Sequence, residues 1–197
     1  MPAVDGLMLP QVIVLNGCSS AGKTTLARAL QQVLPEQYLN FSIDSVLYAL
    51  PPIDLALMQR GEPIQRRGYD WQALVRGYHY AIPSLLQAGL KLIIDNAWCE
   101  AGEIRELLTE LAGYSVVLVG VQCDAETAAA REARRGDRAP GLSVWELPRV
   151  HQHFCYDIEV DSRDAVDTLV AQLMVKLQSG QDWRGAHETL VRLEMAG

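Results

Sequence analysis

The stretch GCSSAGKTT, residues 17–25, combines glycines, serines, a lysine and threonines in the pattern Gly-x-x-x-x-Gly-Lys-Thr. The glycines let the backbone curl so that successive N–H groups point into one concavity, which suits a phosphate. In such a loop the lysine reaches the β- and γ-phosphates and the hydroxyl after it ligates Mg²⁺. The stretch therefore predicts a site for ATP and Mg²⁺, with Lys23 also catalytic, formed by Gly17, Cys18, Ser19, Ser20, Ala21, Gly22, Lys23, Thr24 and Thr25.

Two aspartates follow apolar runs elsewhere in the chain. Asp95 comes after Leu-Ile-Ile, where a carboxylate that binds Mg²⁺ is expected, so Thr24 and Asp95 form the predicted metal pair. Asp44 is predicted to end the second strand and to act as the base that deprotonates an acceptor hydroxyl. Asp is also a favoured residue at helix starts, so capping roles for both aspartates stay open.

The sequence REARRGDR, residues 131–138, is the densest basic segment of the chain. It predicts a lid over residues 131–141 that closes on ATP and neutralises charge on the transferred phosphoryl group. Arg131 and Arg138 are the predicted catalytic arginines, and Arg131 and Arg135 are predicted to bind the nucleotide. A solvated helix end with local salt bridges to Glu132 and Asp137 is the alternative.

Short apolar runs alternate with helical patterns along the chain. The predicted strands cover residues 11–15, 39–43, 91–94, 115–121 and, more weakly, 156–160. Helical spacing follows in the set Leu26, Leu30, Val33 and Leu34, in the set Leu107, Leu108 and Leu111, and in residues 166–177. Alternating strands and helices predict an α/β fold of the P-loop NTPase class, with five parallel strands flanked by helices. Ligands of such sheets bind at the carboxyl ends of the strands.

Composition restricts the class of protein. The chain has 197 residues, a formal net charge of −7 and a pI of about 5.1, which argues against a nucleic-acid partner. It contains no apolar run of membrane-spanning length, no secretory signal at its start and no metal-type cysteine spacing. We expect one domain over residues 1–197, in the cytoplasm, with reduced thiols and no membrane partner.

Several smaller features leave alternatives open. Residues 51–80 break the strand–helix rhythm and are expected to form an insertion on the substrate side. The aromatic residues of this region and Trp98 either line a pocket or belong to the core. His151 and His153 are two residues apart, but the sequence shows no third ligand near them, so we do not expect a zinc site. The tail, residues 179–197, either packs as an extra helix or supports a homodimer. The candidate aromatic side chains are Tyr69, Trp71, Tyr78, His79, Tyr80 and Trp98.

The motifs taken together resemble the chloramphenicol 3-O-phosphotransferase family. The similarity runs in order through NGCSSAGKTT, LPEQYLNFSIDS, LIIDN, VGVQCD, REARRGDR and YDIEVDS, from about residue 12 to 177. It implies an ATP-dependent kinase with a nucleoside-monophosphate-kinase-like fold and a lid. It also implies a small-molecule hydroxyl as acceptor and Asp44 as the catalytic base. The similarity is weakest over residues 51–80 and 96–98, so the chemistry carries over better than the acceptor, and an antibiotic acceptor is left open.

The sequence thus predicts a cytoplasmic kinase that moves the γ-phosphoryl group of ATP to a hydroxyl of a small molecule. A nucleoside or nucleotide kinase is one alternative, and Arg60, Arg66 and Arg67 would then hold an acceptor phosphate. A sensor that binds ATP without transferring phosphate is another. The absence of a guanine-reading N-K-x-D string disfavours a GTPase.

Overall fold

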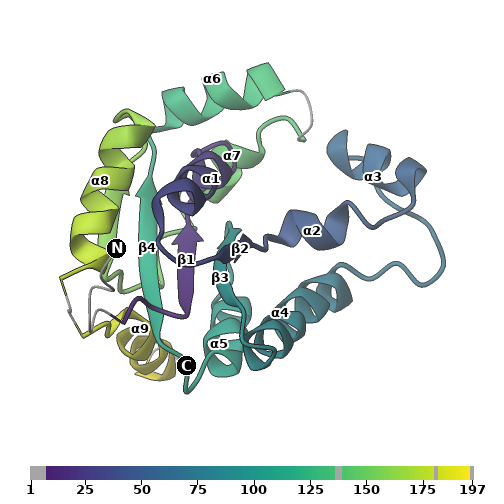
Figure 1. Cartoon of the computed structure of the whole chain (residues 1–197). Coiled ribbons are helices and arrows are strands. Elements are labelled where there is room, and N and C mark those ends of the chain that lie inside the picture. Colours follow the sequence, from purple (N-terminus) through teal and green to yellow (C-terminus); the bar gives the residue numbers. More distant parts are fainter. Residues whose placement is uncertain (1–7, 136–138, 180–181, 196–197) are drawn as a thin grey trace.

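The structure is a computed structural model that describes residues 8–135, 139–179 and 182–195. Its centre is a parallel sheet of five strands in the order β2-β3-β1-β4-β5 (Figure 1). The central strand β1 (Val12–Asn16) pairs with β3 (Lys91–Asn96) on one side and with β4 (Val116–Gln122) on the other. The edge strands are β2 (Tyr38–Asn40) and β5 (Ile158–Asp161). The predicted fold class is confirmed.

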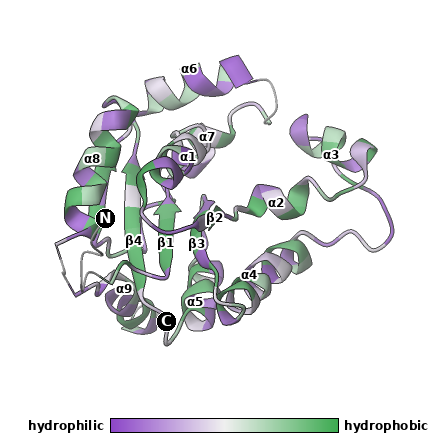
Figure 2. Cartoon of the chain, in the orientation of Figure 1, coloured by the Kyte–Doolittle hydropathy of each residue, from purple (hydrophilic) through white to green (hydrophobic). Residues whose placement is uncertain are grey.

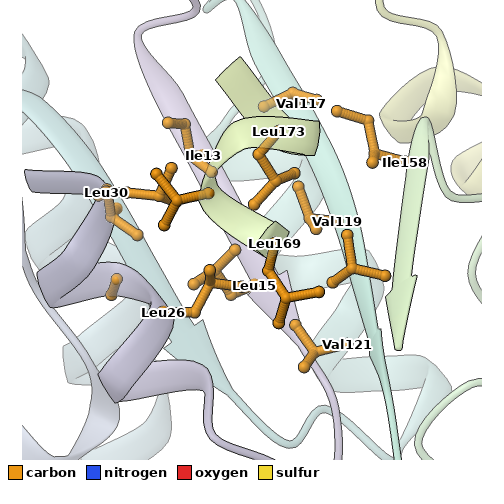
Figure 3. Close-up of a cluster of buried hydrophobic side chains, with 14 of the residues drawn as sticks. Ile13, Leu15, Leu26, Leu30, Val117, Val119, Val121, Ile158, Leu169 and Leu173 are labelled. Atoms are coloured by element: carbon orange, nitrogen blue, oxygen red, sulfur yellow. The ribbon is translucent and has the colours of Figure 1, made fainter. Parts of the chain in front are cut away.

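Helices cover both faces of the sheet because its central strands are apolar on both sides. Ile13 and Leu15 of β1 face α1 (Lys23–Val33) and α8 (Val166–Leu177), where Leu26 and Leu173 close the core (Figure 3). Val12 and the alternate residues along β1 face the opposite layer, formed by α4 (Trp71–Gln87), α5 (Ala101–Glu110) and α9 (Gly185–Met195). Figure 2 shows the hydrophobic colour concentrated on the strands between these layers.

The second strand and the helix after it differ from the sequence expectation. β2 ends at Asn40, and Phe41 makes the last backbone bond to the sheet, to Ile93 O at 2.9 Å. Ser42 then caps α2 (Ile43–Leu47) in an extended conformation. Asp44 and Ser45 favour helix starts over strands, which explains the early end. Asp44 therefore lies in the first turn of a helix, and its predicted place at a strand end is wrong.

Other boundaries shift by smaller amounts. β5 begins at Ile158, two residues later than predicted. The predicted apolar face of α1 is correct for Leu26 and Leu30, but Val33 is 48% exposed. The tail contains α9, which packs on α5 and β4, so the packing helix is confirmed and a homodimer stays a prediction.

Residues 51–80 contain the helix α3 (Pro52–Gln59), a connecting loop and the first turns of α4. Figure 1 shows α3 standing apart from the sheet, beyond α2. Asp54 is its one buried residue, and it pairs with Arg66 of the following loop. Later in the chain, α6 (Ala125–Arg135) and α7 (Leu142–Glu146) come before and after residues 136–138, and Ala139 lies close to Gly61, just after α3. Arg138, predicted to be catalytic, lies outside the described residues.

Candidate functional site

The loop after β1 has a backbone that only particular residues permit. A Cβ atom on Gly17 would lie 2.5 Å from the carbonyl oxygen of Val121, so glycine is required there. Gly22 adopts a positive φ of 95° just before α1 begins. Ser20 also has a positive φ, 64°, and its buried hydroxyl has no hydrogen-bond partner among the described residues. Backbone strain combined with an unsatisfied hydroxyl is typical of a ligand-binding loop.

Lys23 holds the loop in shape from inside. Its side chain is nearly buried, and Nζ donates to Gly17 O at 2.7 Å and to Cys18 O at 2.8 Å. A buried ammonium needs such acceptors because leaving water is costly. The lysine is therefore fixed at the mouth of the loop, where the sequence predicts phosphate oxygens.

Thr24 and Asp95 meet beside the loop. Thr24 Oγ1 donates to Asp95 Oδ1 at 3.5 Å, across the ends of α1 and β3. Asp95 is 5% exposed, and its second oxygen, Oδ2, has no hydrogen-bond partner in the part of the chain that the structure describes. Burial raises the pKa of Asp95, the nearby Lys23 lowers it and Asp44 raises it. A hydroxyl beside an unsatisfied carboxylate oxygen is the donor set that Mg²⁺ prefers, so these residues fit the predicted metal.

Asp44 shares a cleft of about 290 Å³ with Lys23, Thr24 and Asp95. It enters this cleft from α2, and a neighbouring pocket is also lined by Asp44 together with Thr24 and Thr25 of α1. The second strand was misplaced, but the sequence correctly predicted that Asp44 comes together with the phosphate loop and the metal pair. The remaining cleft residues come from α4, β3, α5 and α7 and include Trp71, Cys99, Glu100, Glu103, Leu142, Trp145 and Glu146.

The predicted arginines occupy different positions. Arg131 lies beneath the loop and donates to Ala21 O at 3.2 Å and to Ser162 Oγ and O at 3.1 and 2.7 Å. It lines a second pocket of about 350 Å³, together with Val166 and Leu169 of α8. Arg135 lines both pockets. Arg131 thus stands on the far side of the loop from Asp44, where an apolar floor suits the flat face of a nucleotide base.

The fold agrees with comparisons to known proteins. Residues 10–179 match the family model described as chloramphenicol phosphotransferase-like protein. The chain belongs to this family. A relative from Mycobacterium tuberculosis, named as a candidate O-phosphotransferase, is 32% identical over 178 residues, which cover 82% of this chain and 79% of the relative. The family predicted from the motifs is therefore confirmed.

Solved structures share the fold of this phosphotransferase-like chain. A sugar kinase from Janibacter sp. HTCC2649 matches with a TM-score of 0.65 and 21% identity, over 86% of this chain and 95% of the kinase. The Mycobacterium tuberculosis APS kinase, solved with AMPPNP and APS, matches with a TM-score of 0.63 and 13% identity, over 87% of this chain and 99% of that one. At these identities the comparison establishes a kinase-type P-loop fold.

Glu146 is a residue of the cleft that sequence reasoning missed. Its carboxylate accepts hydrogen bonds from the backbone N–H of Ser19 at 2.5 Å and from Ser19 Oγ at 3.1 Å. α7, which carries Glu146, is held in turn by Glu132, which accepts from the N–H groups of Leu142 and Ser143 at 3.1 Å. The sequence WE at 145–146 matches no motif, so only the chain's path across the loop reveals this contact.

Asn16 is a second residue that was missed. It is fully buried at the end of β1 and donates through Nδ2 to Val150 O and to the Tyr156 hydroxyl, both at 2.7 Å. Its Oδ1 accepts from the N–H of Trp98 at 3.0 Å. The side chain thereby ties the loop after β3 to the segment before β5.

Three of the six candidate aromatic residues, Tyr78, His79 and Trp98, belong to the core. Trp98 and Tyr78 are fully buried, and Trp98 Nε1 donates to His79 Nε2 at 3.2 Å. A pocket role for these three is therefore wrong, because they pack under β3. Trp71 does line the cleft. His151 bonds to the Tyr156 hydroxyl at 2.7 Å, and the described residues contain no group of metal-binding side chains that would include it.

The arginines proposed for an acceptor phosphate lie elsewhere. Arg60 pairs with Glu62 at 2.6 Å, and Arg66 pairs with Asp54. Neither these arginines nor Arg67 line the cleft, in which Lys23 and Arg135 are the cationic residues of the described chain. Over the described ranges, no helix is long and apolar enough to cross a membrane.

Proposed function

We propose that this protein is an ATP-dependent phosphotransferase that moves the γ-phosphoryl group to a hydroxyl of a small molecule. The observation that carries the proposal is the convergence of four side chains on one cleft: Lys23 and Thr24 from α1, Asp95 from β3 and Asp44 from α2. Membership in a phosphotransferase-like family and a fold shared with kinases support the same reaction. The site residues stay predictions until they are tested by substitution.

In the proposed complex the phosphates of ATP lie on the N–H groups of residues 17–25, at the start of α1. Lys23 neutralises charge on the β- and γ-phosphates. Thr24 and Asp95 would hold Mg²⁺, which supplies further positive charge against the phosphate oxygens. Arg131 binds on the nucleotide side, as its contacts with Ala21 and Ser162 favour, and its predicted catalytic role stays untested. Arg135 borders both pockets and is the described arginine best placed to bridge them.

Asp44 accepts the proton of the acceptor hydroxyl as the transfer proceeds. The acceptor oxygen forms a bond to the γ-phosphorus, the bond from that phosphorus to the β–γ bridging oxygen breaks, and ADP leaves with the electron pair. Because phosphoryl transfer needs little covalent help, positioning and charge neutralisation carry most of the rate enhancement. Glu146, which is bound to Ser19, contributes to the shape of the loop at the acceptor side.

A nucleotide kinase is less well supported than transfer to an unphosphorylated alcohol. An acceptor phosphate needs cationic side chains, and the cleft carries Asp44, Asp95, Glu100, Glu103 and Glu146 against two cationic residues among those described. An ATP-binding sensor without activity would have no need for Asp44 in the same cleft as the phosphate loop. A cytoplasmic location and a homodimer also stay predictions.

The proposal is tested by ADP release from Mg·ATP across a panel of alcohols that includes chloramphenicol, aminoglycosides, sugars, nucleosides and nucleoside monophosphates. We expect turnover with at least one unphosphorylated alcohol, abolished in Asp44→Asn and retained in the control Asp167→Asn, which changes an exposed residue of α8. ATP binding without turnover of any acceptor would favour the sensor. Turnover of monophosphates alone would favour the nucleotide kinase.

A further inference from the structure

Five residues of the cleft lining form what we call the acceptor wall: Trp71, Glu100, Glu103, Trp145 and Glu146, of which Glu146 also contacts Ser19 of the phosphate loop. These side chains come from three separate elements, the starts of α4 and α5 and the end of α7. The wall is therefore assembled by the tertiary fold and is not the solvated face of a single helix. Its composition, acids beside indole rings, is unusual for a site that must also admit an anionic nucleotide.

Glu100 and Glu103 carry negative charge that nothing in the described chain neutralises. Neither side chain forms an ion pair or hydrogen bond within the described ranges, although both line the cleft. The start of α5 offers them a favourable helix dipole. Burial nevertheless raises the pKa of Glu103, and the charges of Glu100 and Glu106 raise it further. The carboxylate of Glu103 thus lacks a cation that would stabilise it.

Cys99 lines the same cleft as the three carboxylates of the acceptor wall. Burial first, and then the charges of Glu146, Glu103 and Glu100, raise the pKa of the Cys99 thiol to about 12. Arg149 acts in the opposite direction. Its guanidinium lies 4.6 Å from the ring centre of Trp145 and does not line the cleft. Among the described residues of the acceptor wall, the charged side chains are therefore all acidic.

The rest of the cleft shows that this space is built for a ligand. The unpartnered Oδ2 of Asp95 is buried and belongs to the same cleft. Trp71 and Trp145 leave 42% and 50% of their surface exposed, so their rings can cover a bound molecule. The two cationic residues, Lys23 and Arg135, belong to the phosphate loop and the end of α6, and they flank the nucleotide.

We propose that the acceptor is an amino alcohol or amino sugar whose protonated amine is bound by Glu100 and Glu103 between the indole rings of Trp71 and Trp145. Carboxylates pair with an ammonium group, and indole faces attract it as well. Binding the amine at this wall leaves a hydroxyl of the same molecule to reach Asp44. This inference rests on the proposed phosphotransferase function and adds the chemical class of its acceptor.

The test measures binding to the full-length protein with Mg·AMP-PNP present, so that no turnover is needed. The probes are kanamycin and fully N-acetylated kanamycin, and D-glucosamine and N-acetyl-D-glucosamine. Titration calorimetry should show about tenfold tighter binding of each free amine, a preference that weakens as salt is added. Glu103→Gln and Glu100→Gln should each weaken amine binding about threefold to tenfold and leave the acetylated probes unchanged. Glu126→Gln, an exposed position of α6, is the matched control.

Each outcome decides the inference. Equal binding of free and acetylated amines, or no binding of any probe by protein that binds AMP-PNP, overturns it. Amine-selective binding that Glu100→Gln and Glu103→Gln leave intact also overturns it, because the cation would then sit elsewhere. Measuring ADP release distinguishes a failure of the amine subsite from a failure of the proposed phosphotransferase function. Asp44-dependent transfer to neutral alcohols without amine preference removes the amine subsite and keeps the phosphotransferase. Amine-selective binding with no transfer to any acceptor removes the phosphotransferase.

Discussion

The nucleotide end and the acceptor end of the cleft are built in opposite ways. The phosphate loop follows a strand that is wholly buried, Lys23 is 8% exposed, and Gly17 touches the backbone of β4. On the acceptor side, Trp71 and Trp145 of the acceptor wall are 42% and 50% exposed, and Glu100 is exposed as well. The contrast indicates that the core holds the residues proposed for the chemistry, while the residues proposed for acceptor binding are more exposed.

Removing the lysine of the nucleotide end should have the largest effect. In Lys23→Ala we expect the kcat of transfer to fall about 10²–10³-fold, because a preorganised charge at the transferred phosphoryl group is lost. The change also removes the bonds to Gly17 O and Cys18 O. Steady-state ADP release measures the loss. Lys176→Ala, at an exposed position of α8, should leave the rate unchanged, and an equal loss there would discredit the assignment.

Asp95→Asn, at the nucleotide end of the cleft, should lower activity but raise the free energy of unfolding. Transfer should fall about 10²-fold or more with the loss of the carboxylate ligand. Because the pKa of Asp95 is raised by burial, its charged form costs folding free energy above the unfolded value of 3.8. The apo variant should therefore be more stable than wild type near neutral pH. The gap should close as the pH falls through the folded pKa toward 3.8. Urea unfolding at several pH values checks this, and a gap that widens on acidification would contradict it.

Gly17→Ala tests the close approach of the loop to β4. An added Cβ meets the Val121 carbonyl at 2.5 Å, so we expect a loss of about 1–3 kcal/mol in the free energy of unfolding. Gly77→Ala is the control, since its Cβ would meet nothing within 4 Å on α4 and should be neutral or slightly stabilising. Similar effects at both positions would show that the close approach of residue 17 to β4 does not constrain the loop.

The smallest effect is expected at the acceptor end. Trp71→Ala should raise the KM for the acceptor about tenfold and leave kcat and thermal stability nearly unchanged, because the half-exposed indole lines the cleft and is proposed to contact the acceptor. Tyr80→Ala changes a comparably exposed residue of the same helix that does not line the cleft. A fall in kcat without a change in KM would place Trp71 in the chemistry.

The same contrast explains what could be predicted from the sequence. The roles of the phosphate-loop residues can be predicted because they depend on local spacing, as for Gly17, Gly22, Lys23 and Thr24. The apolar runs of β1 and β4 likewise indicate buried strands. Asp44 was placed in the right cleft but on the wrong element, since the end of a short edge strand depends on its partner β3.

Residues whose contacts lie far away in the sequence could not be predicted, because no local motif marks them. Glu146 reaches Ser19 across 127 positions of the chain, and Asn16 joins segments more than 80 residues apart. The acceptor wall likewise combines three elements that only the fold brings together. The opposite error occurred with the aromatic residues. Residue types such as those of Tyr78 and Trp98 are common in ligand pockets, but here both side chains are buried in the core.

The most direct test of the central claim is transfer itself, followed with γ-¹⁸O-labelled ATP and the best alcohol of the panel. Product analysis by mass spectrometry is combined with ATP binding to wild type and Asp44→Asn. The account predicts a labelled phosphate monoester on the alcohol, a kcat lower by about 10²–10⁴-fold in Asp44→Asn, and ATP affinity unchanged within about twofold. Undiminished transfer by Asp44→Asn, or label found in inorganic phosphate alone, would contradict it.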